Sequence, residues 1–369
     1  MEGNLDEKKY YVALTTHQKI GARTIGKLYK RFKKISAVWS AKEVDLAAAG
    51  LDLGQINAVK EVISKVDPDR ALQEAEKRGI SVVTLADKEY PALLKEIPDL
   101  PAVLYIKGKL LPEDEVSLAV VGSRKYTTYG QRLTEDLVYK LAKNKLTIVS
   151  GLALGIDALA HQAALEAKGR TIGVLGCGLD QIYPVSNTRL ADKILQSGGA
   201  IISEFPIGMP AYRSNFPMRN RIIAGMSLGT LVIEAAVDSG SLITAKAALE
   251  YNREVYAVPG HIYSETSEGP NKLLKMGAKL VTEADDILTD LQIAEKSGQK
   301  EAQEILADTP EEEILLNLLK KPNLVDEIIR TSKLPAPLVN STLIMLEMKG
   351  MISNLGGTCY VIKGKLKKK

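Results

Sequence analysis

Several short segments of this chain combine glycine, serine and basic residues in the way that phosphate-binding turns do. Glycine lets a backbone approach a ligand closely, and the N–H groups that open a helix carry partial positive charge, which attracts an anion. Guanidinium groups can add bidentate contacts to phosphate oxygens, as the pair Arg219 and Arg221 could. The residues that we expect to contact phosphate are Gly122, Ser123, Arg124, Lys125, Ser150, Gly151, Gly155, Arg219, Asn220, Arg221, Ser239, Gly240 and Ser241.

Each of these residues also has an ordinary structural interpretation. Glycines that follow parallel strands are often present only because helix and strand pack closely. His161 lies on the apolar face of the helix predicted over 156–167, so we expect a buried, hydrogen-bonded histidine rather than a ligand. Asp157, in the first turn of that helix, can cap it. Arg124 has fewer structural explanations, since a long cation at the exit of a strand has few packing duties.

Catalytic and metal chemistry find little support. Cys177 and Cys359 lie far apart and match no metal-ligand or CxxC spacing. Residues 21–28 copy most of the P-loop spacing, but Leu28 stands where a Ser or Thr hydroxyl must hold magnesium. The alternative there is a helix-hairpin-helix-like turn over 19–26 that offers N–H groups to a phosphate. We therefore expect no catalytic residue, no metal and no cofactor.

The predicted phosphate contacts follow short β-branched runs that alternate with helical patterns. Alternation of this kind indicates βαβ units, and hence an α/β fold with a Rossmann-like, mostly parallel sheet. The strands are predicted at 118–121, 146–149, 171–175, 200–203, 230–233 and 254–258. Parallel topology places ligands at the carboxyl ends of the strands, which is where the glycine-rich turns occur.

The flanking segments differ in character from this core. Residues 8–42 contain ten Lys or Arg and no Asp or Glu, and the bases recur at helical spacing opposite an apolar face. This basic helix face has two interpretations: it is simply solvated, or it contacts a polyanion. The absence of acidic residues favours contact with a polyanion. We divide the chain into a helical, helix-hairpin-helix/SAM-like domain at 1–85, an extended Rossmann-like DNA-binding domain at 86–292, a linker at 293–309, a winged-helix-like domain at 310–362 and a basic tail at 363–369.

The winged-helix-like segment lacks the charge of a DNA reader. Between residues 310 and 362 the acids outnumber the bases by one, and the candidate recognition helix over 335–349 is mainly apolar. A near-neutral module attracts DNA weakly. We expect it to mediate protein contacts or to support the fold.

Composition is that of an ordinary folded protein, with 45% hydrophobic and 25% charged residues. No apolar run approaches the roughly 20 residues of a membrane span, and the charged start does not fit a signal peptide. We expect a cytoplasmic protein without a membrane span.

The order of motifs in the central segment resembles the DprA (DNA-processing protein A, Smf) family. The matching motifs are Val121-Gly122-Ser123-Arg124, Ser150-Gly151-Leu152-Ala153 with Gly155-Ile156-Asp157 and His161, Gly178-Leu179-Asp180 with Tyr183-Pro184 and Asn187, Ser203-Glu204-Phe205, Phe216-Pro217 with Arg219-Asn220-Arg221, Ser239-Gly240-Ser241 and Val258-Pro259-Gly260. Upstream, Tyr90-Pro91 and Leu104-Tyr105 resemble the segment that precedes this domain in the family.

The resemblance implies that the chain binds single-stranded DNA during DNA uptake and natural transformation and passes it to the RecA recombinase, without catalysis. It implies a DNA pocket that includes the Gly-Ser-Arg turn at 122–124 and the Ser-Gly-Ser turn at 239–241. It also implies a homodimer formed by the region between Asn271 and Leu280. One residue departs from the family pattern, because Asp238 stands where a basic residue is common.

Two functions of another class are alternatives. A phosphoribohydrolase of the lysine-decarboxylase-like kind would carry a PGGxGTxxE loop, but the corresponding residues 238–245 lack both the Pro-Gly-Gly and the catalytic Glu. A dinucleotide-dependent oxidoreductase would need an acidic residue about 20 residues after a GxGxxG motif, and none is found. An assay for nucleotide hydrolysis separates these enzymes from a binding protein.

Overall fold

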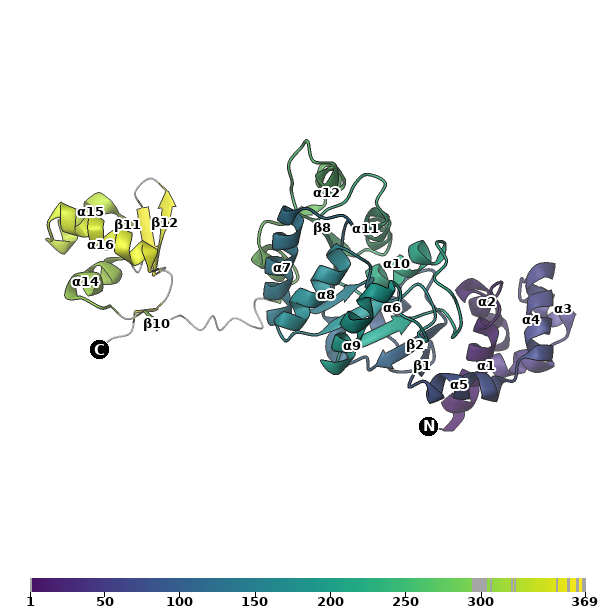
Figure 1. The fold of residues 1–369 in the computed structure, drawn as a ribbon. Helices are drawn as coiled ribbons and strands as arrows, with labels where there is room; N and C mark the ends of the chain where they lie inside the picture. The colour runs from purple at the N-terminus through teal and green to yellow at the C-terminus, as the bar shows by residue number, and fades with distance from the viewer. Residues whose placement is uncertain are drawn as a thin grey trace. The chain divides into compact units, whose positions relative to one another are not determined.

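The computed structural model describes residues 2–293, 304–305, 307–319, 321, 323–349, 351–356, 359–362 and 365–366. It divides into two compact units, Met1–Gln292 and Ile293–Lys369. Figure 1 draws both units as ribbons. Each unit has its own hydrophobic core.

The first unit is built around one nine-stranded sheet in the order β1-β2-β6-β5-β4-β3-β7-β8-β9. The strands β6, β5, β4, β3, β7, β8 and β9 are parallel, whereas β2 pairs antiparallel with both β1 and β6. The bounds are β1 (Ser81–Thr84), β2 (Val103–Gly108), β3 (Ser117–Val121), β4 (Thr147–Ser150), β5 (Thr171–Val174), β6 (Ala200–Ser203), β7 (Gly229–Val232), β8 (Glu254–Ala257) and β9 (Lys279–Leu280). The predicted α/β fold and its mostly parallel sheet are confirmed.

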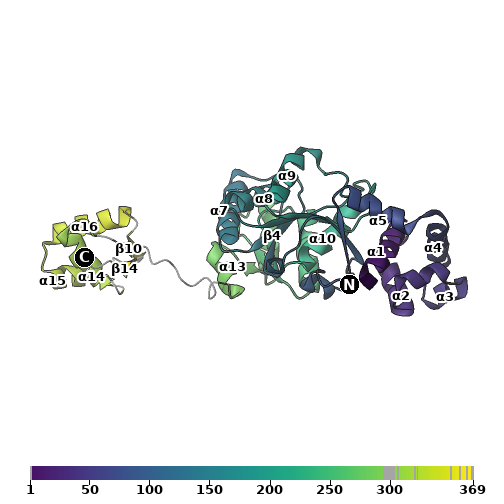
Figure 2. The same ribbon diagram turned by 90° about the horizontal axis from the view of Figure 1, so that it is seen from below.

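Helices cover both faces of this sheet. On one face α7, α8 and α9 pack in succession, and on the other α10 contacts both α6 and α11. Figure 2 shows α10 on the side of β4 that is opposite α8 and α9. Ala119 and Val121 of β3 face the second group, where they share a buried cluster with Ile222 and Ala245. The bounds are α6 (Ala92–Lys95), α7 (Thr128–Lys143), α8 (Ile156–Glu166), α9 (Thr188–Gln196), α10 (Asn215–Gly225), α11 (Gly240–Glu250), α12 (Glu265–Lys275) and α13 (Ala284–Asp290), with 3-10 turns η2 (Pro112–Glu115) and η3 (Val185–Asn187).

A helical module precedes the sheet. Its elements are α1 (Glu2–Thr15), α2 (Ala22–Phe32), η1 (Ile35–Ser40), α3 (Glu43–Ala48), α4 (Leu53–Lys65) and α5 (Pro68–Lys77). Helix α2 is amphipathic as predicted, because Ile25 and Leu28 are buried while its basic residues are exposed. The chain enters the sheet at β1, a few residues before the boundary that we placed after residue 85, and that boundary stays a prediction.

The second unit contains three helices and a three-stranded sheet in the order β11-β13-β12, which is a winged-helix arrangement as predicted. Leu315, Ile328, Leu343 and Leu346 form its core. The bounds are β10 (Glu304–Ile305), α14 (Pro310–Leu318), β11 (Asn323–Leu324), α15 (Val325–Ser332), α16 (Ala336–Met348), β12 (Ile352–Gly356), β13 (Cys359–Ile362) and β14 (Lys365–Leu366). Most of the predicted linker 293–309 and of the predicted tail 363–369 lies outside the described residues, although β10 and β14, which belong to them, pair in parallel.

Across the described residues, no helix combines the length and apolar character that crossing a lipid bilayer demands.

Candidate nucleic-acid interface

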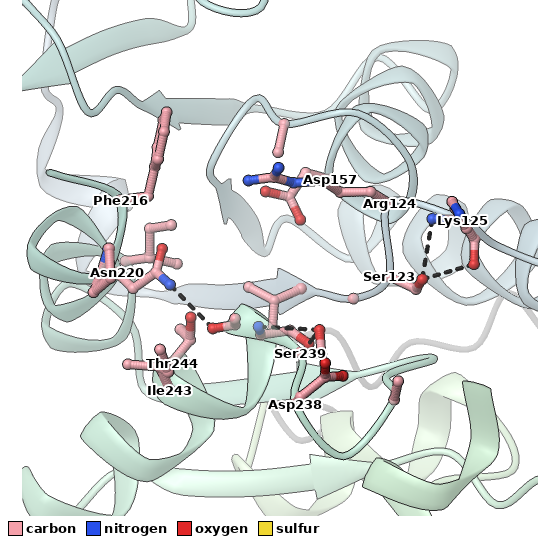
Figure 3. Close-up of a pocket in the computed structure, with 18 of the residues that line it drawn as sticks. Ser123, Arg124, Lys125, Asp157, Phe216, Asn220, Asp238, Ser239, Ile243 and Thr244 are labelled. Carbon is pink, nitrogen blue, oxygen red and sulfur yellow. Dashed lines mark hydrogen bonds between the residues drawn. The ribbon is translucent and has the colours of Figure 1, made fainter. Parts of the chain in front are cut away.

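The main cavity of the first unit lies where the strand order of the sheet reverses. The chain passes from β3 outward through β4, β5 and β6, then returns to the other side of β3 with β7, β8 and β9. The loops after β3 and β7 therefore leave in opposite directions, and a crevice opens between them at the carboxyl ends of the strands. The crevice is a cavity of about 780 Å³, bounded also by α10 and α11 (Figure 3).

The loop after β3 is held from below by Glu234, the second residue after β7. The Ser123 amide donates to the Glu234 carbonyl (2.6 Å), and the buried Glu234 carboxylate accepts from the Thr127 amide (2.9 Å) and hydroxyl (2.6 Å). Within the loop, the Ser123 hydroxyl donates to the Lys125 carbonyl at 2.6 Å. The Arg124 side chain takes part in none of these hydrogen bonds. It is exposed, with its guanidinium carbon 5.9 Å from the centre of the Phe216 ring.

Glycine brings the loops after β3 and β4 into close contact. Gly155, just before α8, has φ of +84°, and a Cβ atom there would collide with the Ser123 carbonyl. A Cβ atom at Gly122 would lie 2.7 Å from Cγ1 of Ile156. Both glycines thus fix the shape of the cavity wall. For these two residues the structure supports the packing interpretation, and the expected phosphate contact stays a prediction.

Beneath the cavity lies a buried pair of opposite charges, Arg219 and Asp157. Nη1 of Arg219 donates to the carbonyls of Gly151 (2.5 Å) and Val174, while Oδ2 of Asp157 accepts from the Gly151 amide at 3.1 Å. Burial raises the pKa of Asp157, and the neighbouring Arg219 opposes that rise. Burial likewise lowers the pKa of Arg219 to about 10, so the guanidinium stays charged at neutral pH. Asp157 does not cap α8 as expected, since its carboxylate binds the preceding loop instead.

His161 is buried, as the sequence predicted. Its Nδ1 lies 2.7 Å from the Thr171 hydroxyl, and burial lowers its pKa to about 3, so the ring is neutral near pH 7. The neutral ring lies in the core of the sheet domain and lines neither the main cavity nor its neighbours.

The N-terminus of α11 forms the opposite wall of the cavity. The Ser239 hydroxyl accepts from the Ser241 amide (3.4 Å) and lies 2.7 Å from the Ser241 hydroxyl. From α10, Nδ2 of Asn220 donates to the Gly240 carbonyl at 3.1 Å. Figure 3 shows Ser239 and Asn220 facing the loop that carries Arg124 across the cavity. Helix N-termini of this kind attract anions.

The expected clamp of Arg219 and Arg221 is wrong. The two residues lie on helix α10 rather than in a turn, and side chains two residues apart on a helix point to different sides. Arg221 is only 8% exposed, and its guanidinium pairs with Glu204 and, at 3.5 Å, with Asp99. Arg221 therefore pairs with the largely buried Glu204 and the partly exposed Asp99, and it does not line the main cavity.

The structure brings most of the remaining predicted residues together. Those that line the main cavity are Gly122, Ser123, Arg124, Lys125, Arg219, Asn220, Ser239, Gly240 and Ser241. Gly151 lines a smaller cavity beside it, together with Arg124 and Phe216. Ser150 and Gly155 line neither cavity, and the buried Ser150 hydroxyl donates to the Val120 carbonyl at 2.6 Å.

Among the cavity residues that the predicted set lacks are two aromatic residues and two charged residues at the surface. Tyr183 and Phe216 lie side by side, with ring centres 5.5 Å apart, and Arg213 is an exposed cation just before α10. Asp238, noted only as a departure from the family pattern, is exposed at the mouth. The sequence signal for Arg213 is its position three residues before Phe216, since cations near aromatic residues are typical of single-strand binding.

The arrangement suits binding more than bond breaking. Exposed cations, helix-opening N–H groups and paired aromatic rings are the elements that hold phosphates and stack bases. Within the part of the chain that the structure describes, no three His, Cys, Asp or Glu residues are grouped as metal ligands would be.

Comparison with known proteins gives consistent matches over nearly the whole chain. A model of DNA recombination-mediator protein A matches residues 81–292, and a model of the DprA winged helix domain matches residues 298–358. Protein Smf of Escherichia coli is 44% identical over 74% of this chain and 75% of its own length. Protein Smf of Synechocystis is 33% identical over 96% of this chain and 98% of its own length.

Two solved structures agree with this result. DNA processing protein A (DprA) from Streptococcus pneumoniae superposes with a TM-score of 0.68 at 36% identity, covering 76% of this chain and 97% of its own. The structure of DNA processing protein A from Helicobacter pylori, which describes its single-stranded DNA binding mode, superposes with a TM-score of 0.52 at 31% identity. The match covers 58% of this chain and 95% of the Helicobacter pylori chain. The glycine-rich crevice lies within the domain that these proteins share, and the chain belongs to the DNA processing protein A (DprA/Smf) family.

Proposed function

We propose that this protein binds single-stranded DNA in the main cavity and acts, without catalysis, as a mediator that loads the RecA recombinase onto that DNA during uptake and recombination. The observation that carries the proposal is the crevice between the loops after β3 and β7, where Arg124, Lys125 and Arg213 line the same cavity as the N-terminus of α11. The Helicobacter pylori relative, described by its binding of single-stranded DNA, supports the ligand. The family description as a recombination mediator supports RecA as the partner.

We also propose a homodimer through the region between Asn271 and Leu280. This region supplies the end of α12 and the strand β9, which is the last strand of the sheet. Met276 and Leu280 are exposed there. A sheet edge with exposed apolar side chains is a natural surface for a second copy.

For the winged-helix unit we propose protein contacts rather than DNA binding. Ile344, Met345 and Met348 of α16 are exposed. Apolar side chains on that helix offer neither the cations nor the amides that read a DNA groove.

The direct test is a titration of the full protein with single-stranded oligonucleotides of unrelated sequence at several salt concentrations. We expect similar affinities for all sequences, because amides and cations contact phosphates without reading bases. For single strands the logarithm of the affinity should fall with the logarithm of salt concentration with a slope of about −0.7 per phosphate contact. Fluorescence anisotropy measures both quantities. An affinity that does not change with salt, or hydrolysis of added nucleotides, would contradict the proposal.

A second test removes the negative charge of the Asp238 side chain at the mouth of the cavity. Asp238 is exposed and forms no ion pair with the described residues, so it repels a nearby phosphate. We expect Asp238→Asn to strengthen single-stranded DNA binding by about 0.2–1 kcal/mol, the range of an exposed charge interaction, which is roughly 1.4- to 5-fold. The gain should shrink as salt rises. Asp192→Asn, on α9, is the matched control and should leave the affinity unchanged.

A further inference from the structure

Helix α2 of the N-terminal module presents a basic surface that the proposed DNA site does not use. We call it the α2 basic face, and it consists of Arg23, Lys27, Lys30 and Arg31 of the helix together with Lys34, two residues past its end, all exposed. Lys27 donates to the Gly50 carbonyl (2.6 Å) and Arg31 lies 3.8 Å from Asp45. The other three form no ion pair with the described residues, so their charge is available to a partner.

A second cavity joins this face to the main one. It has a volume of about 560 Å³ and is bounded by Arg23 at the start of α2, by Pro217 and Met218 of α10, and by Ile243 and Lys246 of α11. Pro217 and Ile243 also line the main cavity. The two cavities thus share a wall, and the path between them runs over the exposed surface of α10 and α11.

The N-terminal module is attached firmly enough to keep this path open. Nζ of Lys8 lies 3.2 Å from the Asp87 carboxylate and donates to the Val82 carbonyl at 3.1 Å. The Thr15 hydroxyl hydrogen-bonds the buried Tyr105 hydroxyl at 2.6 Å. A single buried cluster also continues from α1 and α2 into the sheet. The α2 basic face therefore has a defined position relative to the main cavity.

From this continuity we infer that a single DNA strand held in the main cavity continues through the second cavity and binds the α2 basic face. The inference rests on the proposed function and adds an interaction surface to it. Met218 and Ile243 are 46% and 45% exposed and offer apolar surface to bases. Arg23 supplies a charge for the phosphates on the same path, and Lys246, which lies 3.8 Å from the Glu250 carboxylate, supplies a second beside the acids Glu250 and Asp99 of that cavity.

The basic face fits a polyanion better than a membrane. Amphipathic helices that bind lipid must insert their apolar side. Ile25 and Leu28 of α2 are already buried in the module and are not available for insertion. A nucleic-acid strand needs only the charged side of the helix, which is the side that is free.

The test compares a short and a long strand. A thymidine oligonucleotide of about six residues fills one binding site, whereas one of about 30 residues can also reach α2. In the triple variant Arg23→Gln, Lys30→Gln, Lys34→Gln, we expect at least tenfold weaker binding of the long strand at about 50 mM salt. Its salt slope should fall by about 2, which is three contacts at 0.7 each. Binding of the short strand should not change.

The matched control removes three charges from other helices of the same module. In Lys60→Gln, Lys65→Gln, Lys77→Gln, both strands should bind as in the wild type. Lys246→Gln provides a second variant on the path itself, and it too should weaken only the long strand. Circular dichroism verifies that each variant is folded, as expected for exposed positions.

Each other outcome has a defined meaning. Equal losses for both strands, an unchanged long strand, or an equal loss in the control would overturn the inference and leave the proposed function standing. Failure of the wild-type protein to bind the short strand, with the long strand lost in the triple variant, would instead overturn the proposed function, because the α2 basic face would then be the main site.

Discussion

Arg219→Leu is expected to lower the free energy of unfolding by about 3–5 kcal/mol, because it leaves a buried carboxylate without its counter-charge. Arg219 is 5% exposed and faces Asp157 across Gly151. The substitution also removes the donor to the carbonyls of Gly151 and Val174. Chemical denaturation at pH 7 measures the change.

The loss of stability in Arg219→Leu should grow as pH rises. Burial already raises the pKa of Asp157 in the folded protein, and without the guanidinium that pKa rises further. The folded variant then binds a proton more tightly than the unfolded chain, so its stability is greatest below the unfolded pKa of about 4. Stability should fall as pH rises from about 4 through the folded pKa, and then level off. Adding Asp157→Asn should remove most of this pH dependence.

Arg213→Leu serves as the control for this experiment. Arg213 is exposed just before α10, so its loss should change stability by no more than about 0.5 kcal/mol. If Arg219→Leu changed the stability as little as Arg213→Leu, the buried charge pair would not stabilise the floor of the cavity.

Arg124→Ala should weaken binding of single-stranded DNA by about 1–3 kcal/mol, the range for a charge-assisted hydrogen bond, while leaving the fold intact. The side chain is exposed at the mouth of the cavity, beside Phe216, and its loop is held by Glu234 without it. Binding titrations combined with thermal unfolding separate affinity from stability.

The matched control is Arg78→Ala. Arg78 is exposed at the end of α5, where it pairs with Glu74, and it lines none of the cavities described above. Its removal should leave DNA affinity unchanged. A folded Arg124→Ala protein with wild-type affinity would place the DNA contact elsewhere.

The parallel strands could be predicted because their residues leave few alternatives. Runs such as 118–121 and 200–203 are short, apolar and followed by glycine-rich or polar turns, as buried strands are. Once the strands are known, parallel topology places the turns at one edge of the sheet. Most of the predicted cavity residues, Arg124 and Ser239 among them, follow from that placement. The antiparallel pair β1 and β2 was not predicted, since local pattern does not fix long-range pairing.

The segment around α10 could not be predicted correctly, and the reason is Pro217. Proline usually interrupts a helix, but Pro217 occupies the first turn of α10, where its missing N–H does no harm. With a helix in place of a turn, Arg219 points under the cavity and Arg221 points away from it. Sequence spacing alone does not distinguish an exposed guanidinium from one that compensates a buried acid.

The reversal of strand order at β3 also affects when the binding crevice can exist during translation. One wall, at Gly122, leaves the ribosome roughly a hundred residues before the other wall, at Ser239. At about 5–20 residues per second, that interval is on the order of ten seconds. During this time β3 has β4 beside it but lacks β7, so one flank of the central strand is unpaired. A nascent chain therefore has no complete crevice for DNA until synthesis has passed α11.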